Sequence, residues 1–179
     1  MKRNIIICGL IAGLIVTALM MAAMAKIDSF NNYAGSMLVG YTSMLVAFSL
    51  IFVAIKNSRD KYGNGTITFG KAFRIGLVIT LIASTMYVVV WMIDYYYFIP
   101  DFYQKYAAHQ LREMKAAGAT AAQLAAKAAE VQKYGDLYKN PFYNAMFTYL
   151  EILSVGLIVS VLAAVILKRK PTDNVVLTN

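Results

Sequence analysis

The sequence contains very little of the chemistry from which catalytic and metal sites are usually built. Among its 179 residues there are one histidine, one cysteine and only 9 acidic residues. Cys8 alone excludes an internal disulfide, a redox pair and a cysteine-based metal motif. His109 has no neighbouring set of metal ligands, so we expect a solvated surface histidine. The composition predicts no metal ion, no cofactor and no enzymatic activity.

Charge is scarce as well, and long apolar runs take its place. Only 15% of the residues are charged and 60% are hydrophobic, whereas soluble domains carry about 25% charged residues. Four apolar runs are long enough to cross a bilayer, at residues 5–25, 34–55, 75–99 and 142–167. The pattern predicts an all-α fold, a four-span transmembrane helix bundle. One integral membrane domain would cover residues 1–171, followed by a short polar tail at 172–179.

The first apolar run has a rival interpretation as a cleavable signal peptide. It follows the basic head Lys2 and Arg3, and residues 23–25 (AMA) resemble a cleavage site. The run is longer than the usual signal core, and further spans follow it. We therefore favour a retained helix, followed by a short polar connection at residues 26–32. Cleavage after Ala25 is the alternative.

The net charge of +8 suggests nucleic acid at first sight, but the placement of the basic residues argues against it. Two lie in the N-terminal head, five between residues 56 and 74, and three at 168–170. With four spans, these ten share one side of the membrane, and short basic loops mark the cytoplasmic side. We expect a bacterial inner-membrane protein with both termini cytoplasmic. Its expected partners are the lipid bilayer and other membrane proteins or a second copy of the chain, with no nucleic acid.

Residues 101–139 are polar and have a helical pattern, which predicts an outer helical hairpin between spans three and four. Gly118 is typical of a helix C-cap. Thr120 followed three residues later by Gln123 forms a capping box, which would open the second helix. We therefore expect two helices joined at residues 118–120, standing outside the membrane.

The last run begins at Asn140 and Pro141, a good N-cap followed by a good first helical residue. At 100° per residue, its polar side chains fall on one face, and small residues from Gly156 onward fall on nearly the opposite face. The third run also has a polar face. Ionisable residues within spans are functional candidates. The candidate intramembrane polar site consists of Glu151, Asp94, Tyr87, Thr148 and Asn144.

Depth brings two of these candidates together. Counted inward from Phe142, Glu151 lies roughly 13 Å below the outer end of its helix, and Tyr87 lies roughly 16 Å below Phe98 in the third helix. We therefore expect the two polar faces to meet. Tyr87, or a hydroxyl of the second span, Thr42 or Ser43, would hydrogen-bond Glu151. An ionised carboxylate alone in hydrocarbon is expensive, so Glu151 should face protein, bind a partner or stay protonated.

Two functions compete. The first is a non-enzymatic structural or partner-binding membrane protein, acting through helix packing or through the outer hairpin. The alternative is a small proton-coupled transporter or permease that uses Asp94 and Glu151. Asp94 lies close to the interface, and the sequence has no internal repeat typical of transporters. We therefore favour the first.

Two motifs give the chain a resemblance to a known family. Residues 65–73 (GTITFGKAF) precede the third span, and residues 139–146 (KNPFYNAM) open the fourth, which continues through Glu151 to residues 155–160 (VGLIVS). With the basic head followed by Gly9 and Gly13, these resemble the membrane proteins grouped as domain of unknown function 4199. The similarity covers the chain to Pro171. It implies four spans with a charged segment between the third and fourth, and it implies no activity, cofactor or site residue.

Overall fold

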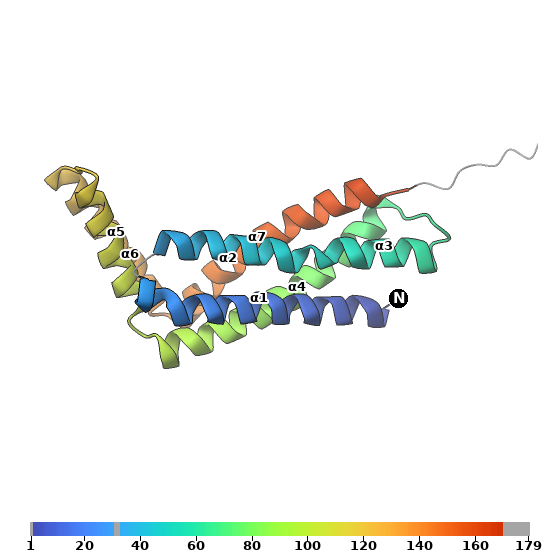
Figure 1. Cartoon of the computed structure of the whole chain (residues 1–179), viewed down its shortest axis with the longest axis horizontal. Coiled ribbons are helices and arrows are strands. Elements are labelled where there is room, and N and C mark those ends of the chain that lie inside the picture. The colour runs from blue at the N-terminus through green and yellow to red at the C-terminus, as the bar shows by residue number, and fades with distance from the viewer. Residues whose placement is uncertain (1, 31–32, 170–179) are drawn as a thin grey trace, which may run out of the picture.

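The computed structural model describes residues 2–30 and 33–169, and this part of the chain is all-α (Figure 1). The long axis is formed by α1 (Lys2–Phe30), α2 (Tyr33–Phe48), α3 (Leu50–Tyr62), α4 (Phe69–Ile93) and α7 (Pro141–Leu167). A π-helical turn, η1 (Asp94–Phe98), extends α4. The helices α5 (Phe102–Ala116) and α6 (Ala121–Tyr138) form a hairpin at the end opposite the N-terminus.

Four helical segments are long and apolar enough to cross a membrane: Lys2–Ala25, Leu38–Tyr62, Phe69–Phe98 and Pro141–Leu167. Their outward surface is apolar too, with Leu38 73% exposed and Ile166 65% exposed. Continuous apolar surface of this kind is what a helix bundle presents to lipid. The predicted four-span all-α bundle with a hairpin between spans three and four is confirmed. The predicted polar tail, residues 172–179, lies outside the described residues.

The helices depart from the predicted spans in two places. Helix α1 continues to Phe30, through residues that we predicted to be a polar connection. The second span is divided at Ser49, whose hydroxyl donates to the Val46 carbonyl oxygen at 2.6 Å. A serine hydroxyl that bonds back to its own helix competes with the backbone ladder, which accounts for the interruption.

Side-chain caps fix where several helices begin. At the start of α4, the Thr68 side chain accepts a hydrogen bond from the Lys71 backbone N–H. At the start of α7, the side chain of Asn140, which precedes Pro141, accepts one from the Phe142 backbone N–H. At α6, Thr120 and Gln123 form both halves of the capping box. Gly118 has a φ of +82°, the left-handed conformation that ends α5. The predicted hairpin turn and the predicted N-cap of the last helix are confirmed.

Small residues bring α4 close to its two main neighbours. On one side Gly9 and Gly13 of α1 face Ile82 and Met86, so α1 and α4 run in the same direction. On the other side Gly76 of α4 faces Ser160, and Gly156 of α7 faces Thr80. Close approach of this kind is how helices pack in lipid, where the hydrophobic effect does not drive association. Helix α4 is therefore the centre of the bundle.

Candidate functional site

A buried polar cluster joins α4 to α7 near the hairpin end of the bundle. The indole Nε1–H of Trp91 donates to the Asn144 side-chain oxygen at 2.9 Å, and Asn144 is fully buried. The Thr148 hydroxyl, one turn deeper, donates to the Asn144 carbonyl oxygen at 2.9 Å. An indole, an amide and a hydroxyl are neutral groups at physiological pH. This cluster therefore holds two helices together and is not built to transfer a proton.

The polar and small residues of α7 form one continuous stripe, where the sequence predicted two separate faces. Six of the eight buried positions recur every four residues, at Asn144, Thr148, Ile152, Gly156, Ser160 and Ala164, and Val159 and Ala163 lie beside this row. A row of i, i+4 positions is inclined to the helix axis, and ridges of this kind pack into the grooves of a neighbouring helix. The contact with α4 therefore winds around α7: Asn144 and Thr148 of the predicted polar face form its first part, and small residues from Gly156 onward form the next.

Glu151 lies beside this stripe and is exposed at the surface of the bundle. The nearest polar side chain that acts on it electrostatically is Tyr41 of α2. The predicted partners were wrong. Ser43 donates to the Gly40 carbonyl oxygen at 2.7 Å, and the described contacts of Tyr87 and Thr42 include no hydrogen bond to Glu151. The buried stripe contains every fourth residue of α7. Glu151 is therefore not part of it and lies on the side of α7 near α2.

Tyr87 and Asp94 occupy half-buried places on the hairpin half of α4 and η1. The ring of Tyr87 packs against both the main core and a second buried cluster formed by Met20, Trp91 and Tyr95. Asp94 opens the π-helical turn, and its carbonyl oxygen accepts from the Ile99 backbone N–H at 2.9 Å. One Asp94 carboxylate oxygen is buried without a hydrogen-bond partner among the described residues. No described hydrogen bond joins Asp94 to Glu151, so the candidates do not form one site.

An aromatic layer fastens the hairpin to the bundle. The Tyr96 hydroxyl donates to the Tyr138 carbonyl oxygen at 3.0 Å. The ring of Tyr138 stacks on Phe147 of α7 at 5.7 Å between centroids and on Tyr103 of α5 at 5.2 Å. Burial raises the pKa of Tyr138 to about 12, so its phenol stays protonated. The run of tyrosines after Trp91 was the available signal, but it gives no partner on α6.

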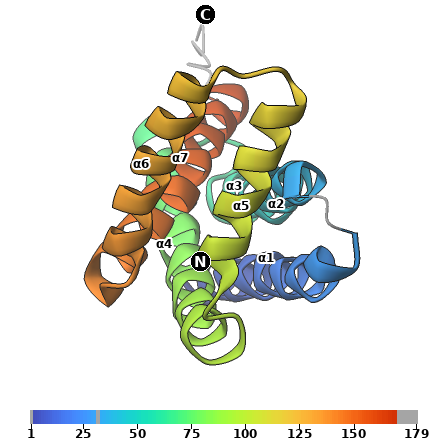
Figure 2. The ribbon, with the colours of Figure 1, turned by 90° about the vertical axis from the view of Figure 1, so that its left-hand side faces the viewer.

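The hairpin itself has almost no core of its own. No residue of α5 is buried, and Val131 is the only buried residue of α6. Gly135 brings α6 against the ring of Tyr103, where an added Cβ would lie 3.0 Å from a ring carbon. Figure 2 shows the two helices lying side by side at this end of the molecule. A cavity of about 350 Å³ lies between their inner faces and Tyr95.

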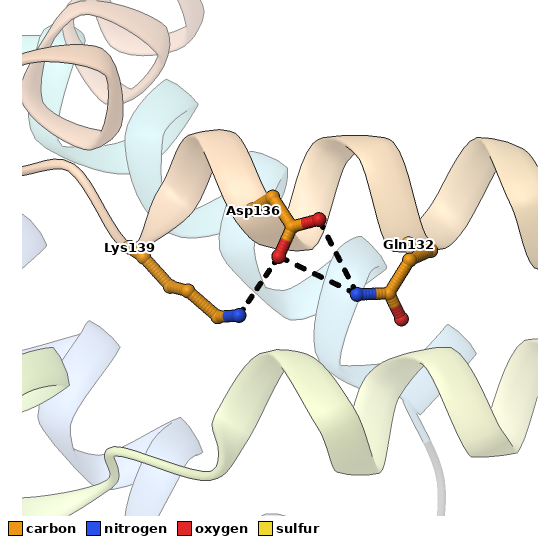
Figure 3. Close-up of polar contacts among 3 residues, drawn as sticks. All are labelled: Gln132, Asp136 and Lys139. Carbon is orange, nitrogen blue, oxygen red and sulfur yellow. Dashed lines mark hydrogen bonds and ion pairs between the residues drawn. The ribbon is translucent and has the colours of Figure 1, made fainter.

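A three-residue polar chain borders this cavity at the end of α6 (Figure 3). The Lys139 ammonium donates to Asp136 Oδ1 at 2.8 Å, and the Gln132 amide reaches both carboxylate oxygens at 3.3 and 3.4 Å. The hydrogen bonds from Lys139 and Gln132 hold the pKa of Asp136 below its usual range. The carboxylate is already engaged by its own helix, so this chain stabilises the helix end.

His109 is more enclosed than the sequence suggested. Its side chain is 13% exposed, and Nε2 lies 3.2 Å from Glu113 Oε1. The prediction of a solvated histidine is therefore wrong, and the i, i+4 spacing on α5 also places Glu113 beside it. Within the described ranges, no group of three His, Cys, Asp or Glu side chains could hold a metal ion.

Comparison with known proteins gives one finding. The model of the family described as "Protein of unknown function (DUF4199)" matches residues 7–169. No curated protein and no solved structure matches the chain.

Proposed function

The chain belongs to the DUF4199 family, and from its structure we propose that it is a non-enzymatic membrane protein that binds a protein partner through the outer hairpin. The observation that carries this proposal is the contrast between the two parts of the hairpin. Its base is fixed to the bundle by the aromatic layer, whereas the helices beyond it bury a single residue. A rigidly mounted surface with little internal packing is suited to contacts with another molecule.

The charge of the hairpin favours an acidic partner. All of its carboxylates have local partners: Asp101 pairs with Lys105, Glu113 with His109, Glu130 with Lys127 and Asp136 with Lys139. Arg112, Lys115 and Lys133 are exposed and have no ion pair among the described residues. Unpaired surface cations speed and orient association with an acidic surface. We place the protein in a bacterial inner membrane with the hairpin outside, on the charge asymmetry of the loops.

The test is capture of partners by chemical crosslinking in native membranes. The triple change Arg112→Glu, Lys115→Glu and Lys133→Glu should abolish the crosslinked species that the unchanged chain gives. A matched control reverses charge at the other end of the bundle, with Lys56→Glu, Lys61→Glu and Lys168→Glu, and should keep it. Equal capture by both variants and the unchanged chain would contradict the proposal.

The second candidate, a proton-coupled transporter, is favoured by the position of Glu151. The carboxyl group is exposed on the bundle, and the side chain of Tyr41 lies close to it. A group in that position could exchange a proton with a neighbouring water or substrate. Glu151→Gln should leave proton flux in proteoliposomes unchanged if the protein is a partner-binding one. Loss of flux with an intact fold would favour the transporter.

A further inference from the structure

A lipid-facing groove runs between the first turns of α1 and α4, at the end of the bundle opposite the hairpin. It has a volume of about 730 Å³, within the range of roughly 300–1,000 Å³ that is typical of small-molecule sites. Its walls are apolar side chains from both helices: Ile5, Ile6, Ile75 and Val78. Gly70, at the start of α4, leaves the mouth of the groove open.

Three cations line the mouth of the same groove. Lys2 comes from α1, and Lys71 and Arg74 come from α4. All three are exposed, and none has an ion-pair partner among the side chains that the structure describes. Between residues 38 and 93 the only acidic residue is Asp60, which pairs with Arg59 at 2.7 Å. Three like charges around one opening repel each other, and an anion placed between them would relieve this.

The order of the side chains along the two helices separates charge from apolar surface. Because α1 and α4 run in the same direction, the cations of both lie at the same end of the groove. Ile6 lies four residues inward from Lys2, roughly 6 Å, and Val78 lies seven residues inward from Lys71, roughly 10 Å. The groove therefore has a cationic mouth at headgroup depth and a hydrocarbon wall below it.

We propose that this groove binds one anionic phospholipid. The phosphate of the headgroup contacts Lys2, Lys71 and Arg74, and an acyl chain lies along the isoleucine and valine side chains below. This layout repeats that of the lipid itself, with the anion at the interface and hydrocarbon in the bilayer core. Basic pockets between membrane helices are a known form of lipid recognition. A free phosphate ion would use only the mouth, so the apolar wall favours a phospholipid.

Binding can be measured on the purified full chain by native mass spectrometry with phosphatidylglycerol and phosphatidylcholine of identical acyl chains. The unchanged chain should retain phosphatidylglycerol preferentially. The pair Lys71→Gln and Arg74→Gln removes two charge-assisted contacts, and the apparent Kd for phosphatidylglycerol should rise about tenfold or more. Lys2 is kept so that the charge of the N-terminal head is unaltered.

The matched control removes the same charge outside the groove, with Lys61→Gln and Lys168→Gln, and should bind phosphatidylglycerol like the unchanged chain. If the groove pair and the control pair of substitutions weaken phosphatidylglycerol binding equally, the chain has only a general attraction to anionic lipid. That result would overturn the proposed site. Equal retention of the two lipids by the unchanged chain would overturn it as well.

A second variant tests the apolar wall with the cations intact. Val78 is 37% exposed, and Val78→Trp places a bulky ring in the path of the acyl chain. Phosphatidylglycerol retention should fall in this variant. Competition by millimolar inorganic phosphate, with unchanged lipid retention by Val78→Trp, would show that the mouth takes a free anion and would overturn the assignment to a phospholipid.

Discussion

At the scale of single residues, the side-chain oxygen of Asn144 is a buried acceptor that is held by a donor from another helix. Asn144 is fully buried, and it accepts a hydrogen bond from the indole of Trp91, which lies 53 positions earlier in the sequence. A buried acceptor that loses its donor carries the whole cost of desolvation, whereas losing both partners together is close to neutral. The pair can therefore be tested by removing its members singly and together.

Trp91→Phe should lower the free energy of unfolding in detergent micelles by about 1–3 kcal/mol, because the Asn144 oxygen then loses its indole donor. The double variant Trp91→Phe with Asn144→Leu should recover most of that loss. Tyr97→Phe is the matched control, because Tyr97 is 80% exposed. The free energy of unfolding of this variant should equal that of the unchanged chain. Simple additivity of the two changes would show that the residues do not act as a pair.

Asp136 gives a prediction in which pH is the variable. Its folded pKa is depressed below the ordinary value of about 3.9, chiefly by the hydrogen bond from Lys139. The contribution to helix stability is therefore present above that ordinary value and is lost as the pH falls through the folded pKa. Lys139→Met removes the largest cause, so the carboxyl resonance of Asp136 should titrate at higher pH. An unchanged titration midpoint would contradict this account.

At the scale of elements, the contact between α4 and α7 depends on two glycines. A Cβ at Gly156 would overlap the Thr80 side chain, and one at Gly76 would lie 2.7 Å from the Ser160 hydroxyl oxygen. The two hydroxyls lie 3.3 Å apart in the same contact. Helix α7 therefore cannot gain even a methyl group here without moving away from α4.

Gly156→Ala should destabilise the bundle by about 1–3 kcal/mol, the usual cost of overpacking a close contact. Gly40→Ala is the matched control, because an added Cβ at Gly40 of α2 meets no atom within 4 Å. Replacing a helical glycine in open space should be neutral or stabilising by about 0.5–1 kcal/mol. Equal effects of the two changes on unfolding in micelles would show that the contact does not limit packing.

At the scale of the whole molecule, orientation in the membrane is the property on which the proposed function depends. The basic end of the bundle and the hairpin lie at opposite ends of the long axis (Figure 1). Cys8 is the single cysteine and is buried in the core. Replacing it gives a cysteine-free chain in which introduced cysteines can be labelled. An introduced cysteine on each end then reports its side of the membrane.

In a Cys8→Ser background, Lys115→Cys should react with a membrane-impermeant maleimide in intact cells. Lys61→Cys should react only after the membrane is permeabilised, because short basic loops stay in the cytoplasm. The Cys8→Ser chain by itself is the control and should not be labelled. The opposite pattern of labelling would reverse the orientation and would remove the hairpin from contact with an outer partner.

The sequence by itself determined the four-span class, the hairpin and its turn, because these depend on local properties. Apolar length sets what can cross a bilayer, and residues such as Thr120, Gln123, Asn140 and Pro141 fix helix starts through contacts with their own backbone. The meeting of α4 and α7 also followed from counting depth along the two helices. The span class, the hairpin and its turn required no knowledge of how helices distant in the sequence pack together.

Only the tertiary structure decided which polar residues are buried. A helical wheel with a fixed angle assigned Asn144, Thr148 and Glu151 to one face, but the contact with α4 follows an inclined row of every fourth residue. Asn144 and Thr148 lie on that row, and Glu151 lies off it and faces Tyr41 instead. The crossing angle of two helices depends on the positions of the small residues on both helices. The sequence of one helix alone therefore does not determine that angle.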